Sequence, residues 1–134
     1  MTKVYKPEGY SSVSVYIVAD GAQRLIDFLI AAFDARPLRR FDLPDGSIMH
    51  AEVQIDDTLV MIADSGDGNP AFPVWLHVYV ADVDETYRRL LEAGGISVQE
   101  PMQKQGDPDR RGGIKDPVGN TWWIGTQVGE KAAL

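Results

Sequence analysis

The side chains best suited to chemistry are the two histidines of the chain and a carboxylate close to the first of them. His50 and Glu52 are two residues apart, so on a β-strand both would face the same side. Together with His77 they would supply two imidazoles and one carboxylate, the residue types of a facial-triad metal site. The competing interpretation is that His50 and Glu52 pair with neighbours or line a cleft. We prefer it, because a residue match without structural context is weak evidence for a metal.

Other familiar catalytic arrangements are absent from the sequence. The chain has no cysteine, which excludes disulfides, thiolate metal sites and cysteine nucleophiles. It also has no Ser-His-Asp arrangement, phosphate-binding loop or dinucleotide fingerprint. The glycine-rich segment Gln103–Gly113 could act as a lid whose Arg110 and Arg111 meet an anionic ligand, but a solvated surface loop is the preferred interpretation.

Composition limits the partners. The 134 residues suffice for one domain with its own core, and 44% hydrophobic and 25% charged residues are typical of a globular protein. Thirteen Lys and Arg against 20 Asp and Glu leave a net charge of −7, which argues against nucleic acid and anionic membranes as partners. The longest apolar run, Leu25–Phe33, contains Asp27 and is too short to span a bilayer. We therefore predict a cytoplasmic protein without a membrane partner.

An internal repeat organises the elements that must position these side chains. Val18–Gln23 and Val80–Glu85 match at an offset of 62 residues, and each follows a β-type run and precedes a helical pattern. Asp20 and Asp82 are predicted to cap the two helices. The helices are expected at about Ala22–Phe33 and Asp84–Ala93.

Strand patterns flank each helix. The predicted strands are Val13–Val18, Leu38–Leu43, Ser47–Ile55 and Thr58–Ala63 in the first half, and Trp75–Val80, Ser97–Gln103, Arg110–Lys115 and Asn120–Thr126 in the second. Each half is therefore a βαβββ repeat, with modules at residues 10–65 and 74–128. We predict an α+β fold, a single domain over residues 1–134 in which a curved mixed sheet encloses a cleft and carries the helices on its outside.

Side-chain alternation along these strands sorts the residues by face. The residues predicted to face the cleft are His50, Glu52, Gln54, Val60, Ile62, His77, Tyr79 and Trp123. The residues predicted to face the helices are Ala51, Val53, Ile55, Leu59, Met61, Leu76, Val78, Trp122 and Ile124. An apolar cleft with few polar groups is typical of a small-molecule site, and Trp123 and Tyr79 could stack on a flat or cationic ligand. The alternative is that these rings only fill a cavity.

Four strings of the sequence carry a family resemblance: Tyr16–Ala22, Gly46–Glu52, Leu76–Asp84 and Asp116–Trp122. They resemble the vicinal oxygen chelate superfamily, which includes glyoxalase I, extradiol dioxygenases and the bleomycin- and fosfomycin-resistance proteins. The resemblance covers roughly residues 10 to 128, and the string Ile48–Glu52 is similar to the PhnB-like branch. It implies the glyoxalase-like fold, while the activity stays open because the superfamily hosts many chemistries and some pure binders.

The resemblance also implies where a metal would bind. Metalloenzymes of this superfamily take one ligand from the first strand and one from the last strand of each half. The repeat places these positions at Val15, Val60, His77 and Trp123. Only His77 can bind a metal, and a catalytic divalent ion usually needs three protein ligands. We therefore predict no metal and no other cofactor, with His77 as a hydrogen-bonded histidine of the shared fold.

These expectations leave more than one function open. The preferred hypothesis is a binding protein, similar to the bleomycin-resistance members, that holds a small molecule such as a drug in an aromatic cleft without a metal. The alternative is a metal-dependent lyase, isomerase or dioxygenase of the vicinal oxygen chelate type. A third hypothesis is an enzyme in which His50 or His77 is a general base without a metal. Whether the chain is an enzyme stays open.

The first predicted helix points to a partner. Its apolar residues extend over more than one stripe: Leu25, Ile26, Phe28, Leu29, Ile30 and Phe33. A helix this apolar needs a second cover, either the N-terminal arm (residues 1–10) or another subunit. Members of the resembling superfamily commonly form dimers whose clefts combine halves of two chains, so we predict a homodimer.

Overall fold

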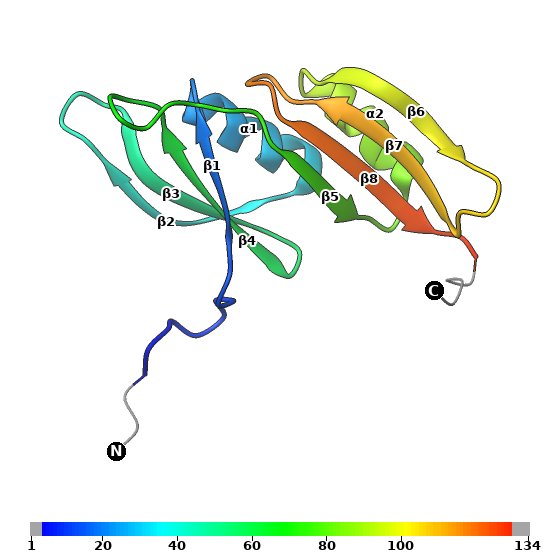
Figure 1. Cartoon of the computed structure of the whole chain (residues 1–134), viewed down its shortest axis with the longest axis horizontal. Helices are drawn as coiled ribbons and strands as arrows, with labels where there is room; N and C mark the ends of the chain where they lie inside the picture. Colours follow the sequence, from blue (N-terminus) through cyan, green and yellow to red (C-terminus); the bar gives the residue numbers. More distant parts are fainter. Residues whose placement is uncertain (1–3, 130–134) are drawn as a thin grey trace.

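The computed structural model describes residues 4–129, which form two βαβββ modules (Figure 1). The first module contains β1 (Val15–Ala19), α1 (Ala22–Phe33), β2 (Arg36–Asp42), β3 (Ile48–Ile55) and β4 (Thr58–Asp64). The second contains β5 (Trp75–Tyr79), α2 (Val83–Glu92), β6 (Ile96–Gln103), β7 (Asp109–Lys115) and β8 (Thr121–Gln127). The predicted α+β fold of two repeats is confirmed.

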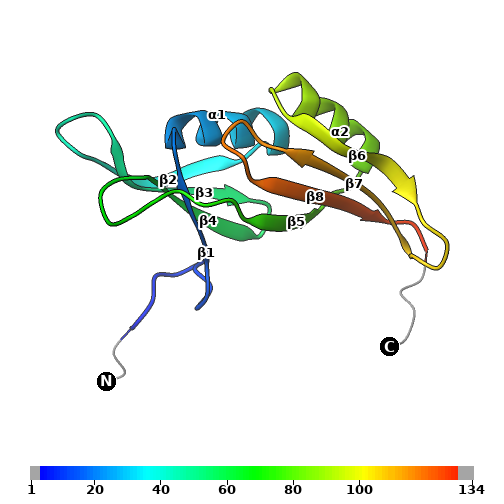
Figure 2. The ribbon, with the colours of Figure 1, turned by 45° about the horizontal axis from the view of Figure 1, so that its top comes forward.

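Each module folds into its own four-stranded mixed sheet. The strand orders are β1-β4-β3-β2 and β5-β8-β7-β6, with β1–β4 and β5–β8 parallel and the other pairs antiparallel. Figures 1 and 2 show the two sheets side by side, with α1 and α2 on the same side of the molecule. Each sheet therefore has one face covered by helices and one open face.

The two helices begin in different ways. Asp82 caps α2 as predicted, because its side chain accepts the Glu85 backbone N–H at 3.2 Å. The prediction for Asp20 is wrong: Gly21, in the left-handed region, is the N-cap of α1, and it offers no side chain. A distant residue satisfies this helix end instead. One carboxylate oxygen of Asp64 accepts the Ala22 N–H at 2.8 Å and the other accepts the N–H of Ile48 at 2.7 Å.

The second module covers the additional apolar surface of α1. One continuous core includes α1 residues together with Leu90 of α2 and Trp122 of β8. The Phe33 ring packs against the Trp122 ring with centroids 5.4 Å apart, and Arg89 of α2 forms an ion pair with Asp34 at 2.7 Å. The second module is therefore a cover for this helix that the sequence did not suggest, and Ile30 stays 37% exposed. The hydrophobic effect favours burial of the apolar surface of α1, and the second module of the same chain buries part of it.

No helix within residues 4–129 is long and apolar enough to cross a membrane.

Candidate functional site

The open faces of the two sheets carry the polar and aromatic side chains. On β3, Ala51, Val53 and Ile55 belong to the core, so the alternate residues point to the open side. The first open face comprises Tyr16 of β1, His50, Glu52 and Gln54 of β3, and Met61 of β4. The second open face comprises Trp75, His77 and Tyr79 of β5, Arg111 of β7 and Trp123 of β8.

The facing predicted for β4 is wrong. Val60 and Ile62 lie in the core at 3% and 0% exposure, and Met61 lies beside Tyr16 and Glu52 on the first open face. A shift of one residue reverses every side chain of a strand, and the predicted repeat contained such a shift. The facing predicted for β8 is correct, since Trp122 and Ile124 are buried in the core.

The same shift changes which residues correspond between the modules. Helix α1 begins at Ala22 and α2 at Val83, an offset of 61 rather than 62. His77 therefore corresponds to Tyr16, not to Val15. Their neighbours on the paired parallel strands are Trp123 and Met61, so Met61 replaces Val60 as the counterpart of Trp123.

The four positions at which the resembling metalloenzymes hold a metal are thus Tyr16, Met61, His77 and Trp123. They offer a phenol, a thioether, an imidazole and an indole. The indole N–H only donates hydrogen bonds, and an imidazole is the single strong ligand for a divalent ion in this set. The donor set does not fit a catalytic divalent metal. Within the described part of the chain, no group of three or more His, Cys, Asp or Glu side chains is arranged to hold one.

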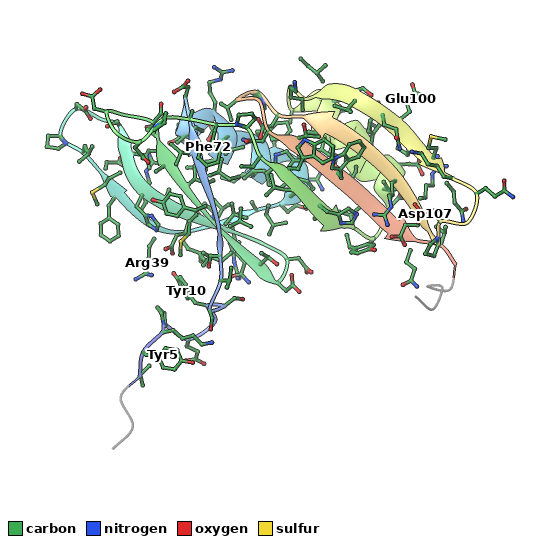
Figure 3. All side chains as sticks on the ribbon, in the orientation of Figure 1. Tyr5, Tyr10, Arg39, Phe72, Glu100 and Asp107 are labelled. Carbon is green, nitrogen blue, oxygen red and sulfur yellow. The ribbon has the colours of Figure 1, made fainter. Side chains whose placement is uncertain are left out.

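A buried carboxylate organises the first open face. The Glu52 side chain is fully buried, and it accepts hydrogen bonds from His50 Nε2 at 2.8 Å, from Arg39 Nε at 3.3 Å and from the Tyr10 hydroxyl. Figure 3 shows Tyr10 and Arg39 close together beside the first sheet. Burial alone would raise the pKa of Glu52, but these three hydrogen bonds outweigh burial and hold the pKa below its usual range. Glu52 is therefore ionised and paired near neutral pH.

This pairing predicts acid sensitivity. The pKa of Glu52 is lower in the folded than in the unfolded chain. Ionised Glu52 therefore stabilises the fold at pH values above its pKa in the unfolded chain, and this contribution is lost as the pH falls through its pKa in the folded chain. We expect the free energy of unfolding to fall below about pH 4.3 and to fall less in Glu52→Gln. Denaturant titrations across this range measure the difference. Glu100→Gln, at an exposed glutamate, is the control, and an identical acid response in both variants would contradict the prediction.

The second open face holds a histidine beside a charged network. Arg111 forms ion pairs with Asp107 at 3.0 Å and with Asp109 at 2.6 Å, and its Nη1 contacts His77 Nε2. The Tyr79 hydroxyl donates to the same oxygen of Asp109, Oδ2, at 2.6 Å. Partial burial, followed by the charge of Arg111, lowers the pKa of His77. His77 is therefore neutral, and its Nε2 accepts a hydrogen bond from Arg111. The imidazole is held in place by this hydrogen bond and acts as a fixed polar group.

Aromatic rings line the rest of this face. Trp75 and Trp123 pack edge to face with centroids 5.5 Å apart, and Trp75 is 75% exposed. The Trp123 ring lies directly over Gly113, where an added Cβ would meet it at 2.7 Å. The Trp123 Nε1 atom is buried and has no hydrogen-bond partner within residues 4–129. A buried donor without a hydrogen-bond partner lowers stability by about 1–3 kcal/mol. A ligand atom that accepts a hydrogen bond from this N–H would remove that penalty.

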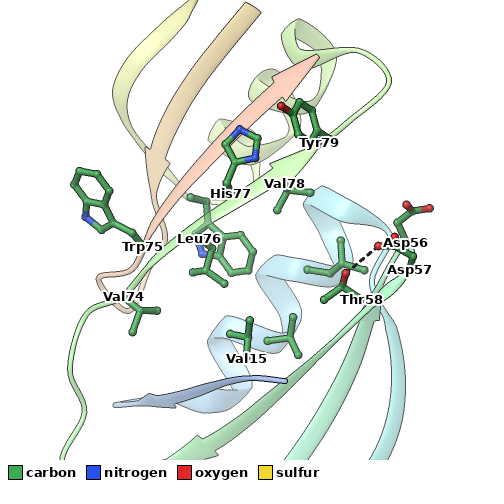
Figure 4. Close-up of a pocket in the computed structure, with 13 residues that line it drawn as sticks. Val15, Asp56, Asp57, Thr58, Val74, Trp75, Leu76, His77, Val78 and Tyr79 are labelled. Atoms are coloured by element: carbon green, nitrogen blue, oxygen red, sulfur yellow. Dashed lines mark hydrogen bonds between the residues drawn. The ribbon is translucent and has the colours of Figure 1, made fainter. Parts of the chain in front are cut away.

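A cavity of about 540 Å³ lies between the modules. Its walls come from β1, β4, β5 and the Asp56–Thr58 turn, and Figure 4 shows Val15 facing it from one module and the β5 residues from the other. The predicted site residues His77 and Tyr79 border this cavity, and Val60 lines it from the core side. His50, Glu52 and Gln54 lie outside it on the first open face, so the structure distributes the predicted site residues over two surfaces.

Several residues of these surfaces were not predicted. Tyr16 and Met61 were missed because the alignment of the repeat was wrong by one residue and placed Val15 and Val60 at their positions. Tyr10 lies in an arm without periodicity, so no pattern could place it against Glu52. Arg111 belongs to the segment singled out for its charge, but its pairing with Asp109 depends on strand alternation within β7.

Comparisons with known proteins agree with this architecture. The profile of the Glyoxalase/Bleomycin resistance protein/Dioxygenase superfamily matches residues 12–124. The uncharacterized protein Rv0887c of Mycobacterium tuberculosis is 35% identical over 130 residues, which cover 89% of this chain and 76% of Rv0887c. TioX from Micromonospora sp. ML1 has a similar structure, with a TM-score of 0.74 and 26% identity over 87% of this chain and 98% of its own.

The fosfomycin resistance protein FosX from Mesorhizobium loti is similar in fold alone. Its TM-score is 0.64 at 16% identity, over 90% of this chain and 92% of FosX. The family profile extends over both modules, from before β1 into β8. The chain therefore belongs to the glyoxalase/bleomycin resistance protein/dioxygenase superfamily.

Proposed function

We propose that this protein binds a small, flat organic molecule without a metal, and that the second open face is its main contact surface. The observation that carries the proposal is Trp123. It occupies a position where metalloenzymes of the superfamily have a metal ligand, it packs against the exposed Trp75, and its buried N–H has no hydrogen-bond partner in the described part of the chain. Two indoles and the exposed Tyr79 ring provide stacking surfaces, which is the typical equipment of a site for aromatic ligands.

The charges around these rings favour a neutral or cationic ligand over an anion. Asp107 and Asp109 carry two negative charges, and the single positive charge of Arg111 is engaged by both. The net charge of the chain is −7. Aromatic faces attract cations, and a nearby excess of negative charge adds to that attraction. A flat aromatic cation is therefore the ligand class that this face fits best.

The proposal includes a homodimer in the cytoplasm. Among residues 4–129 no strand pairs with the outer edges of β1 and β5, and exposed edges and exposed aromatic faces both favour association. A second copy would place a first open face opposite a second one and complete an enclosed cleft. Sedimentation at micromolar concentration is expected to give twice the 14.8 kDa of one chain, and a single 14.8 kDa species would contradict the dimer. Membership of the PhnB-like branch, suggested by Ile48–Glu52, is part of the same proposal.

The binding proposal is tested by fluorescence titration with two probes, bleomycin and the flat aromatic cation proflavine. Wild-type protein is expected to bind at least one of them equally well with and without EDTA. Trp123→Ala is expected to lose about 1–3 kcal/mol of binding, or roughly 5- to 150-fold in affinity, as anchor aromatics do. Phe72→Ala, at an exposed ring in the segment between β4 and β5, is the control and should bind as wild type.

Three results would overturn the proposal. They are binding that requires a divalent metal, equal affinity of wild type and Trp123→Ala, and no binding of either probe. The alternative, a metal-dependent lyase, isomerase or dioxygenase, has no matching donor set among residues 4–129.

A further inference from the structure

A chain of hydrogen bonds leads from the buried carboxylate of the first open face to an exposed hydroxyl. Glu52 Oε2 and His50 Nε2 are 2.8 Å apart, and His50 Nδ1 and the Tyr16 hydroxyl oxygen are 3.3 Å apart. The rings of Tyr16 and His50 lie side by side, with centroids separated by 5.7 Å. Exposure to solvent rises along this series of hydrogen bonds: the Glu52 side chain is fully buried, the His50 side chain is 22% exposed and Tyr16 is 45% exposed.

The surroundings of Glu52 set the direction of these hydrogen bonds. Its Oε1 atom accepts from Tyr10 of the N-terminal arm and from Arg39 of β2, so the carboxylate is an acceptor throughout. His50 Nε2 must therefore donate to Oε2. The neutral imidazole then keeps its lone pair on Nδ1, which faces the Tyr16 hydroxyl. From β4 the neighbour is the uncharged Met61, so no further charge competes with this arrangement.

We propose that Glu52, His50 and Tyr16 form a proton relay that makes the Tyr16 hydroxyl a general base on the first open face. A base next to a hydroxyl, oriented by a third group, is the arrangement by which enzymes activate side-chain hydroxyls. His50 takes the Tyr16 proton while the Tyr16 oxygen takes a proton from the substrate, and Glu52 stabilises the resulting imidazolium. The substrate class is a proton acid, such as a phenol, an enol or a carbon acid next to a carbonyl group. Tyr16 is the catalytic residue, and His50 and Glu52 act through it.

The relay and the proposed ligand binding can fail separately. The relay consists of residues of β1 and β3, and the aromatic anchor Trp123 lies on β8 in the other module. A test of the relay therefore needs no knowledge of the natural ligand. It needs a reagent that reports whether the Tyr16 oxygen forms a new bond while its proton moves to His50.

The reagent is 4-nitrophenyl acetate. The Tyr16 oxygen attacks the acetyl carbon, the bond from that carbon to the nitrophenyl oxygen breaks, 4-nitrophenolate leaves, and the Tyr16 proton passes to His50 Nδ1. The products are O-acetyl-Tyr16 and an imidazolium that returns its proton to water. Peptide mass spectrometry measures acetylation at each tyrosine as a function of time and pH.

Tyr16 is expected to be acetylated faster than Tyr5 and Tyr79, although both are more exposed. Tyr79 is the matched control, because its hydroxyl donates directly to the carboxylate of Asp109, while the neighbouring His77 packs against the Tyr79 ring. His50→Gln and Glu52→Gln are expected to slow the labelling of Tyr16 by about 100-fold, the lower end of the range for a positioned general base.

Tyr10→Phe separates the relay from a structural role of Glu52. This variant removes one hydrogen bond to the same carboxylate but leaves His50 and Tyr16 in place, so Tyr16 should be labelled at close to the wild-type rate. The proposal is overturned if Tyr16 reacts no faster than Tyr5, if Glu52→Gln leaves the Tyr16 rate and its pH profile unchanged, or if Tyr10→Phe slows labelling as much as His50→Gln. Thermal unfolding of each variant shows whether it remains folded at the temperature of labelling.

Discussion

Trp122→Ala is expected to lower the free energy of unfolding by about 3–5 kcal/mol, as truncation of a large buried aromatic ring does. Trp122 is 1% exposed, packs against Phe33 and joins the cores of both modules. Its Nε1 also donates to Asp116 Oδ2 at 2.8 Å, so the truncation removes a buried hydrogen bond as well. Denaturant unfolding followed by circular dichroism measures the loss.

The adjacent Trp123 provides the control. It lies on the open side of β8, where its ring touches Trp75 and Gly113 rather than the core. Trp123→Ala should therefore cost clearly less stability than Trp122→Ala, while it weakens binding of the aromatic probes. Equal losses of stability in the two variants would show that the two faces of β8 are assigned incorrectly, and the binding proposal would lose its main support.

Asp116→Ala is expected to cost about 3 kcal/mol or more. Asp116 is 3% exposed and accepts hydrogen bonds from the backbone N–H groups of Val118 and Asn120, from the Asn120 side chain and from Trp122. Its removal leaves several buried donors without an acceptor, at about 1–3 kcal/mol each. Thermal and denaturant unfolding measure the cost.

Asp45 is the matched control for this prediction. It lies in another tight turn, between β2 and β3, where it accepts from the Ser47 N–H at 2.9 Å and from the Ser47 hydroxyl at 2.6 Å, but it is exposed. Water can replace its hydrogen bonds, so Asp45→Ala should cost about 1 kcal/mol or less. If the two variants lose the same stability, burial of the Asp116 network is not what stabilises the turn before β8.

The elements and their order were predictable from the sequence because they depend on local patterns. Helix periodicity and strand alternation depend on residues within one turn or one pleat, and glycine, proline and aspartate mark the ends. The Asp82 cap was predictable for this reason, since its partner Glu85 is three residues away. The Asp20 cap was not, because Asp64, which replaces it, is brought to the helix only by β4.

The faces and the partners of the site residues were decided by the tertiary structure. The structure relates β1 to β5 at an offset of 61 and β4 to β8 at an offset of 62. Offsets of 62 and 63 align the same segments almost equally well by residue type, but they exchange Tyr16 for Val15 and Met61 for Val60, because strand faces alternate at every residue. The contacts of Glu52 with Tyr10, of Arg111 with His77 and of Trp122 with Phe33 join segments far apart in the chain. The sequence determined two βαβββ modules and their chemical groups. Only the packing of strands and modules determined which groups meet, because contacts between distant residues depend on the sum of many weak interactions rather than on any local pattern.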